Sequence, residues 1–297
     1  MIKKVVSWLM LMGITQSCFL LGGNDPKPID MTSFLEPKIF PLENLALIEA
    51  SGIAPSQNFP TLLLTHEDNS GRPNFIHLIT STGGYDSYWE LPFQNRDWED
   101  IAVGPGPTAG TPYIYLGNIG DNLEQYSEYE IYRFPEPRQK GGKIQSVETL
   151  RFQYSDNRSY DAETVMIDPT SRDLYIITKR QFNVRVYKLA FPQKVDQMNS
   201  AQFLFTLPYP FITGGDISAD GKEILLKNYD AVYYWRLREN ETIEQALQRP
   251  RDVAPAYVRE PQGEAICFDR AQTGFFTLSE IGGQGPVQLY FYPKKVN

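Results

Sequence analysis

The chain alternates between short apolar segments and clusters of turn-forming residues along most of its length. The apolar segments are rich in Val, Ile, Tyr, Phe and Leu, and Gly, Pro, Asn and Asp separate them. This pattern is typical of β-strands joined by turns, and it predicts an all-β fold. Helical periodicity is confined to one short candidate helix at 240–249, which Asn240 would cap and Pro250 would end.

A short motif of polar and small apolar residues returns five times along the chain, at 49–54, 97–102, 161–166, 213–218 and 262–267. A turn-rich stretch and two further candidate strands follow each copy, so each copy begins a unit of β-structure of roughly fifty residues. The second strands are expected at 61–65, 113–116, 174–178, 223–226 and 275–278. The third strands are expected at 75–80, 130–134, 185–189, 232–236 and 288–292.

A fourth candidate strand precedes each later copy of the motif, at 88–92, 147–154, 202–207 and 256–259. The fifth unit ends without one, and the candidate strand at 38–42 would complete it from the front of the chain. Repeated four-stranded units are typical of β-propellers, which have about four to eight blades. We therefore predict a single β-propeller of five blades, each of four antiparallel strands, closed by the N-terminal strand. A sixth, degenerate blade between 102 and 160 is the alternative.

The first residues have the pattern of an export signal. A basic start precedes the apolar segment 5–14, which is much shorter than the ~20 residues of a membrane-spanning helix. Cys18 follows a serine and resembles the acylated cysteine of bacterial lipoproteins, although the residues before that serine depart from the usual pattern. We expect a signal peptide at 1–17, a lipidated N-terminus and tether at 18–36, and the propeller domain at 37–297.

This organisation predicts an exported protein of the bacterial cell envelope, anchored by lipid and touching the membrane only through that lipid. Ordinary cleavage, which would leave a soluble periplasmic or secreted protein, is the alternative. The net charge of −8, from 28 basic and 36 acidic side chains, argues against nucleic acid, because its binders concentrate Lys and Arg. Cys267 lies in an apolar segment and is expected to be a buried thiol. We expect a monomer.

Carboxylates recur at two positions of the repeated motif. The first position includes Glu49, Asp97 and Asp161, and the third includes Glu99, Glu163 and Glu264. Side chains two apart on a strand share a side, and the first strand of each propeller blade lines the central channel. Calcium prefers such oxygen ligands. We therefore expect a divalent cation, with Ca²⁺ as the favoured cofactor, bound by Asp97, Glu99, Asp161, Glu163 and Glu264.

A second polar set lies at the ends of the second strands, comprising His66, Asn118, Lys179, Lys227 and Glu280. Together with Glu49 and Asp121, these residues would form a binding site for a small polar ligand at one mouth of the channel. The alternative is structural. Polar residues at repeated positions also hold strands and turns in place, and the loop at 117–122 has the composition of a tight turn.

Several segments are specific enough to suggest a family. They are Ser-Gly-Ile-Ala at 51–54, Asp-Asn-Ser-Gly at 68–71, Asp-Trp-Glu-Asp-Ile-Ala at 97–102, Gly-Asn-Ile-Gly-Asp-Asn at 117–122, Ile-Tyr-Arg-Phe-Pro-Glu-Pro at 131–137, Asp-Ala-Glu at 161–163 and Gly-Glu-Ala-Ile at 263–266. From about 45 to 293 the chain resembles a family of uncharacterised secreted bacterial β-propeller proteins. That resemblance implies a fold and no activity. Asn118 departs from the commoner Asp. A looser likeness runs to phytase-like and gluconolactonase-like calcium-dependent propellers.

Three functions are therefore open at this point. The favoured hypothesis is an envelope lipoprotein that binds a divalent cation, together with a small polar ligand, in its channel. The second is a hydrolase that cleaves glycosides or phosphoesters with the axial carboxylates, which rests on fold analogy alone. The third is a non-catalytic scaffold that binds an envelope protein on one face of the propeller.

Overall fold

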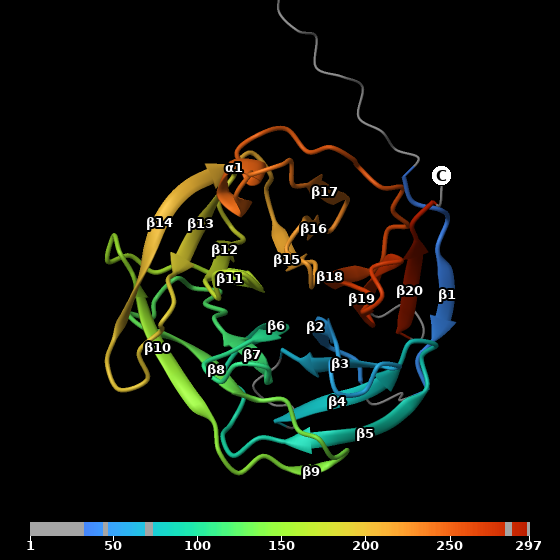
Figure 1. Cartoon of the computed structure of the whole chain (residues 1–297), viewed down its shortest axis with the longest axis horizontal. Coiled ribbons are helices and arrows are strands. Elements are labelled where there is room, and N and C mark those ends of the chain that lie inside the picture. The colour runs from blue at the N-terminus through green and yellow to red at the C-terminus, as the bar shows by residue number, and fades with distance from the viewer. Residues whose placement is uncertain (1–32, 44–46, 69–73, 283–286, 296–297) are drawn as a thin grey trace, which may run out of the picture.

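The computed structural model describes residues 33–43, 47–68, 74–282 and 287–295. Within these residues the chain forms twenty strands and one helix. The strands form antiparallel sheets arranged around a common centre (Figure 1). The all-β prediction is therefore confirmed. No helix in this part of the chain is long and apolar enough to cross a membrane. The leader at 1–17, Cys18 and most of the tether lie outside the described residues.

Fifteen of the twenty strands form three-stranded antiparallel groups, which we call the first to fifth units. Their strands overlap the positions that the sequence predicts. The units are β2 (Ala50–Pro55), β3 (Leu62–Glu67) and β4 (Phe75–Thr80); β6 (Trp98–Pro105), β7 (Pro112–Asn118) and β8 (Tyr129–Pro135); β11 (Ala162–Ile167), β12 (Leu174–Thr178) and β13 (Val184–Leu189); β15 (Ile212–Ile217), β16 (Glu223–Asn228) and β17 (Val232–Arg236); β18 (Gln262–Phe268), β19 (Gly274–Glu280) and β20 (Gln288–Pro293).

Outer strands extend four of these units. β5 (Tyr85–Glu90), β10 (Glu148–Tyr154) and β14 (Asn199–Leu207) pair antiparallel with β4, β8 and β13. The outer strand of the fifth unit is β1 (Lys38–Pro41), which pairs with β20 from the front of the chain, as expected. Two parallel pairings are additional. β10 pairs with β14, which merges two units into an eight-stranded sheet, and the short β9 (Gly142–Lys143) pairs with β5.

The fourth unit departs from the prediction at its outer edge. The strand expected at 256–259 does not form, and Val253 instead makes an isolated bridge with Tyr234. Pro250, Pro255 and Pro261 interrupt this stretch, and proline removes the N–H groups that an added strand would donate. The expected helix does form as α1 (Ile243–Leu247).

The cap of this helix also differs from the prediction. Thr242, rather than Asn240, begins α1, because its side chain accepts the Gln245 N–H in a capping box. Asn240 instead has a φ of 60°, a left-handed conformation that asparagine tolerates better than most residues. A polar capping residue does begin the helix, as predicted, but it lies two residues after Asn240.

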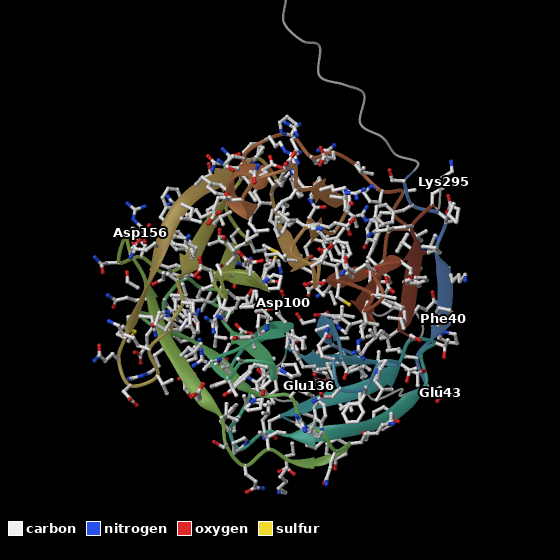
Figure 2. All side chains as sticks on the ribbon, viewed as in Figure 1. Phe40, Glu43, Asp100, Glu136, Asp156 and Lys295 are labelled. Carbon is white, nitrogen blue, oxygen red and sulfur yellow. The ribbon has the colours of Figure 1, made fainter. Side chains whose placement is uncertain are left out.

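The innermost strands form a ring. β2, β6, β11, β15 and β18 each contact the next in this order, and β18 closes against β2 (Figure 1). Side chains fill the space between neighbouring units, with Asp100 near the centre and Asp156 and Lys295 at the rim (Figure 2). Apolar clusters hold the units together, such as the buried cluster that includes Leu64 of the first unit and Trp98 of the second. Cys267 is buried and unbridged in one of these clusters, as predicted.

Each inner strand is irregular near its beginning. The register with the second strand shifts across Glu99 in β6, Glu163 in β11 and Glu264 in β18. A β-bulge leaves its extra residue outside the ladder and redirects the side chain, and bulges are frequent beside functional sites. In β15 the shift falls at Thr213, so the sequence alignment, which matched Gly215 to the glutamates, is two residues out of register there.

Candidate functional site

Three buried carboxylates meet at the centre of the ring. Glu99, Asp161 and Glu163 each place one oxygen within 4.8 Å of the others, and we call them the axial triad. Their exposed fractions are 3%, 0% and 3%. Glu99 and Glu163 occupy bulges of neighbouring strands, and Asp161 directly precedes β11. The sequence prediction that repeated carboxylates converge is therefore realised for these three residues.

The loop at 117–122 closes one side of the triad, and its second glycine is explained by close contact. A Cβ atom on Gly120 would lie 2.2 Å from Glu99 Oε1 and 2.5 Å from Asp97 Oδ2. Only glycine leaves room for both carboxylates at this point. The next residue of the loop, Asp121, donates its backbone N–H to Asp161 Oδ1 at 2.8 Å. Asp97 is thus beside the triad, as predicted.

Two cations already lie against the triad. Lys179 Nζ is 2.5 Å from Glu163 Oε1 and 3.4 Å from Glu264 Oε1. Arg180 Nε is 2.6 Å from Asp161 Oδ2. Glu163 Oε2 is buried and has no hydrogen-bond partner among the described residues. An unpaired, buried carboxylate oxygen is unfavourable unless a further cation or proton reaches it.

The electrostatics around Glu99, Glu163 and Asp97 oppose full ionisation of these three carboxyl groups. Burial, and then the charges of Glu163 and Asp97, raise the pKa of Glu99 well above its usual range. Burial and the charge of Glu264 raise the pKa of Glu163 despite Lys179. Burial and Asp161 raise the pKa of Asp97 to about 6. Neighbouring carboxylates in a desolvated site hold protons more tightly, and a bound divalent cation would replace those protons.

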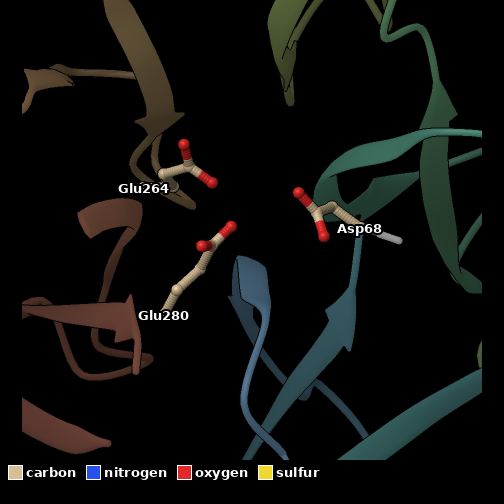
Figure 3. Close-up of side chains that lie close together, drawn as sticks. All are labelled: Asp68, Glu264 and Glu280. Atoms are coloured by element: carbon tan, nitrogen blue, oxygen red, sulfur yellow. The ribbon is translucent and has the colours of Figure 1, made fainter. Parts of the chain in front are cut away.

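A second carboxyl cluster is connected to the first through Lys179, and Figure 3 shows its three side chains. Asp68, Glu264 and Glu280 place one oxygen each within 4.8 Å of the others. Burial and the charge of Glu264 raise the pKa of Asp68 to about 7 and that of Glu280 to about 10. Glu264 also accepts the Tyr229 hydroxyl at 2.7 Å. Asp68 and Glu280 therefore hold their protons more tightly than free carboxyl groups do, and Lys179 connects this cluster to the triad.

The second cluster divides the predicted metal set and adds a residue that sequence reasoning missed. Glu264 was expected with Glu99 and Glu163, but its carboxylate belongs with Asp68 and Glu280. Asp68 directly follows β3, just as Glu280 ends β19. The position of Asp68 at the end of a second strand could therefore have identified it from the sequence. Glu49 lies nearby, since its carbonyl accepts the Asp68 N–H at 3.2 Å.

Lys227 belongs to a separate buried group rather than to the channel site. Its ammonium donates to the Gly263 carbonyl and lies 3.8 Å from Glu260 Oε2. It also lies 5.0 Å from the centre of the Tyr257 ring. Lys227 is fully buried, and burial lowers its pKa despite the charge of Glu260. This lysine neutralises Glu260 between the fourth and fifth units.

His66 supports the fold rather than the candidate site. It is fully buried, packs edge-on against Trp98, and lies where a Cβ on Gly52 would be. Burial lowers its pKa to about 4, so it is neutral near pH ~7. A buried neutral imidazole in a packed aromatic environment has no access to a ligand in the channel.

Asn118 and Asp121 hold the loop that borders the triad. Asn118 Oδ1 accepts the Asp97 N–H at 3.1 Å, and its amide donates to Glu130. The Asp121 carboxylate accepts two backbone N–H groups, at 125 and 126, and the Tyr129 hydroxyl. Both were predicted as ligand-binding residues. Their side chains instead make hydrogen bonds that hold the loop in place. This agrees with the structural alternative, in which the segment at 117–122 is a tight turn.

Two further carboxylates join neighbouring inner strands. Asp100 Oδ2 accepts the Val165 N–H at 2.9 Å, which connects β6 to β11. Asp216 Oδ2 accepts the Phe268 N–H at 2.9 Å, which connects β15 to β18. We call this pair the strand-joining aspartates. Their hydrogen bonds hold neighbouring strands of the ring together.

Comparisons with known proteins give likenesses to solved structures. No family model matches the chain, and no curated protein matches it. A solved structure of a luciferin-regenerating enzyme is similar with a TM-score of 0.49 and 10% sequence identity, over 86% of this chain and 95% of that chain. This likeness carries no conclusion about what the chain binds or does.

Proposed function

We propose that the chain is a single five-bladed β-propeller that binds a divalent cation, calcium in particular, at the axial triad. The five inner strands that contact one another in a ring support the blade count. The cation proposal rests on one observation: three buried carboxylates lie within 4.8 Å of one another, and the buried Glu163 Oε2 has no partner among the described residues.

The donor set suits a hard cation. Calcium takes about six to eight oxygen ligands from carboxylates, carbonyls and water, and tolerates irregular geometry. Glu99, Asp161 and Glu163 supply carboxylate oxygens, and Asp97 lies beside Glu99 on the same side of Gly120. Lys179 and Arg180 neutralise part of this charge while no cation is bound. A cation would compete with Lys179 for Glu163, so binding and the lysine contact are coupled.

A thermal-unfolding experiment tests the cation proposal directly. Calcium that binds only the folded protein raises the melting temperature by mass action. We expect a higher melting temperature in millimolar calcium than in EDTA for the wild type. The double variant Glu99→Gln and Glu163→Gln should lose this shift. Glu136→Gln is the matched control, because Glu136 is also 3% exposed but lies away from the triad. A wild type that melts identically in both buffers would contradict the proposal.

A small polar ligand is the second part of the proposal. Asp68 is only half-buried, and with Glu280 and Tyr229 it offers carboxyl and hydroxyl groups beside the cation. Hydrolysis by the axial carboxylates is less well supported. Glu99, Glu163 and Glu264 are only 2–3% exposed, and Lys179 lies against two of them, whereas an acid–base pair needs an open pocket for its substrate.

We also propose that the protein is exported, belongs to the secreted propeller proteins that its motifs resemble, and is anchored to the cell envelope through Cys18. The residues that carry the anchor precede the described part of the chain, so this proposal rests on the sequence pattern. Expression with a labelled fatty acid tests it. The wild type should incorporate the label and fractionate with membranes, and Cys18→Ala should do neither. A soluble, unlabelled wild type would favour ordinary cleavage instead.

A further inference from the structure

The far mouth of the channel contains a cavity of about 350 Å³. The triad lies where the inner strands begin, and this cavity lies where they end. All five units contribute to its walls through the ends of the inner strands and the loops that follow. The lining includes Val103, Ile167, Pro169, Ile217, Ala219 and Arg270. Cavities of ~300–1,000 Å³ are typical of small-molecule sites.

The walls of this cavity are mostly apolar. Ile167, Ile217 and Val103 belong to the inner strands, and three prolines add further apolar surface. The polar part of the lining, apart from Arg270, consists of Gln57, Asn58 and Thr111. Apolar walls of this size favour a ligand with an apolar body, because burial of that body releases water from both surfaces. Neither the triad nor the second carboxyl cluster contributes a residue to this lining.

Arg270 is the only charged side chain in the lining of this cavity. It is exposed, and its charge acts on the Glu136 carboxyl and lowers that group's pKa, but among the described residues no hydrogen bond or ion pair engages its guanidinium. The nearby Glu136 carboxylate is already satisfied. It accepts the Ser56 hydroxyl at 2.5 Å and the backbone N–H groups at 57 and 58 at 3.0 and 3.2 Å. The guanidinium is therefore free to bind an anion from solution, in the bidentate manner that suits a carboxylate.

We propose that this mouth binds an amphiphilic carboxylate, with its apolar body in the cavity and its head group on Arg270. A cationic amphiphile would place a like charge against the guanidinium. A second cavity, of about 510 Å³, shares Arg270 with the first. Its lining also includes Phe40, Phe276, a second cation, Lys38, and an acid, Asp269. Because that lining includes an acid, we assign the ligand to the smaller cavity, whose lining has none. This site shares no residue with the proposed cation site.

Titration calorimetry with sodium octanoate as the probe tests this assignment. We expect one site per chain for octanoate and no heat of binding for octylammonium chloride. Arg270→Gln should weaken octanoate binding by about tenfold, since a charge-assisted contact is lost. Ala219→Trp, which fills the smaller cavity from an exposed position, should abolish binding. The experiment is run in EDTA, so that it does not depend on the cation site.

Two control variants separate this site from its alternatives. Arg158→Gln removes an exposed arginine elsewhere, and Thr82→Trp obstructs the larger cavity. Both should bind octanoate like the wild type. The proposal is overturned if octylammonium binds equally well, if Arg270→Gln binds unchanged, or if Thr82→Trp rather than Ala219→Trp abolishes binding. Unaltered circular-dichroism melts of the four variants exclude misfolding as the cause.

Discussion

The axial triad and the strand-joining aspartates are two sets of carboxylates with opposite surroundings. Glu99 and Asp100, one member of each set, are consecutive residues of β6. Glu99 is 3% exposed and Asp100 is 2% exposed, so burial does not distinguish them. Glu99 occupies the bulge and faces two other carboxylates of the triad. Asp100 accepts the N–H groups of Ile101 and Val165, both at 2.9 Å. One carboxylate is surrounded by acceptors and the other by donors.

This difference separates a site from a structural contact. A buried acid that accepts backbone N–H groups satisfies donors that would otherwise be unpaired, and so stabilises the folded state. A buried acid beside other acids is unfavourable in the absence of a cation. The strand-joining aspartates are therefore explained by the hydrogen bonds that they accept within the fold. The fold does not explain the triad in the same way, because its carboxylates lie against one another. A bound cation would explain this arrangement.

The largest expected effect comes from removing the internal counter-ion of the triad. Lys179→Met should lower the free energy of unfolding in EDTA by about 3–5 kcal/mol, because a buried partner loses its opposite charge. Calcium should recover part of this loss. Urea denaturation measures both values. Lys188→Met is the control, since Lys188 pairs with Glu244 at a half-exposed site and should cost at most ~1 kcal/mol. A Lys179→Met protein of undiminished stability in EDTA would contradict the role given to this lysine.

Neighbouring substitutions in β6 should have opposite signs. Asp100→Asn should destabilise the protein by about 1–3 kcal/mol, because one backbone N–H loses its acceptor, and calcium should not change this value. Glu99→Gln should raise stability in EDTA at neutral pH, because folding no longer requires a proton on a carboxyl whose pKa is raised, and it should diminish the calcium shift. Both are measured by urea denaturation with and without calcium. Equal losses of stability in the two variants would erase the distinction between triad and strand-joining aspartates.

The strand-joining aspartates should also affect the dependence of stability on pH. Burial raises the pKa of Asp216 from 3.8 to about 7, so the folded protein retains this proton more tightly than the unfolded chain. The resulting stabilisation is complete below pH ~4 and is lost as pH rises toward ~7, by at most ~1.4 kcal/mol per pH unit.

Asp216→Asn provides the measurement for this pH effect. The stability of the wild type relative to the variant should fall between pH ~4 and ~7, as determined by urea denaturation across that range. His66 and His77 act in the opposite direction, because burial lowers the pKa of each to about 4, but they are common to both proteins and cancel. A difference that rises with pH would show that the Asp216 pKa is lowered instead.

The smallest expected effect distinguishes the two carboxyl clusters. Glu280→Gln alters the second cluster and leaves the triad intact. We expect a change in stability of less than ~1 kcal/mol, because a carboxyl with so raised a pKa is already largely neutral. The calcium shift in melting temperature should be retained. If this variant loses the shift as fully as Glu99→Gln does, the cation belongs to the second cluster or bridges both.

Sequence reasoning located most of the structure because the relevant signals are local. Alternating strand and turn residues predicted the inner, second and third strands of all five units, and the strand at 38–42 was expected beside the last unit. The failures are also physical. The strand predicted at 256–259 fails where prolines remove backbone donors. Asn118 and Asp121 have the residue types of a ligand site, but hydrogen bonds within their own loop occupy their side chains.

The sequence by itself therefore determined the class of fold, the order of its strands and the repeated acidic positions. Only the tertiary structure decided which acids meet. The bulges fall at Glu99 and Glu163. The tertiary structure places Glu264 with Asp68 and Glu280, and Lys227 with Glu260. The reason is that a strand's own residues specify its pattern. The register, and the neighbours of each side chain, depend on pairing with strands that lie far away in the chain.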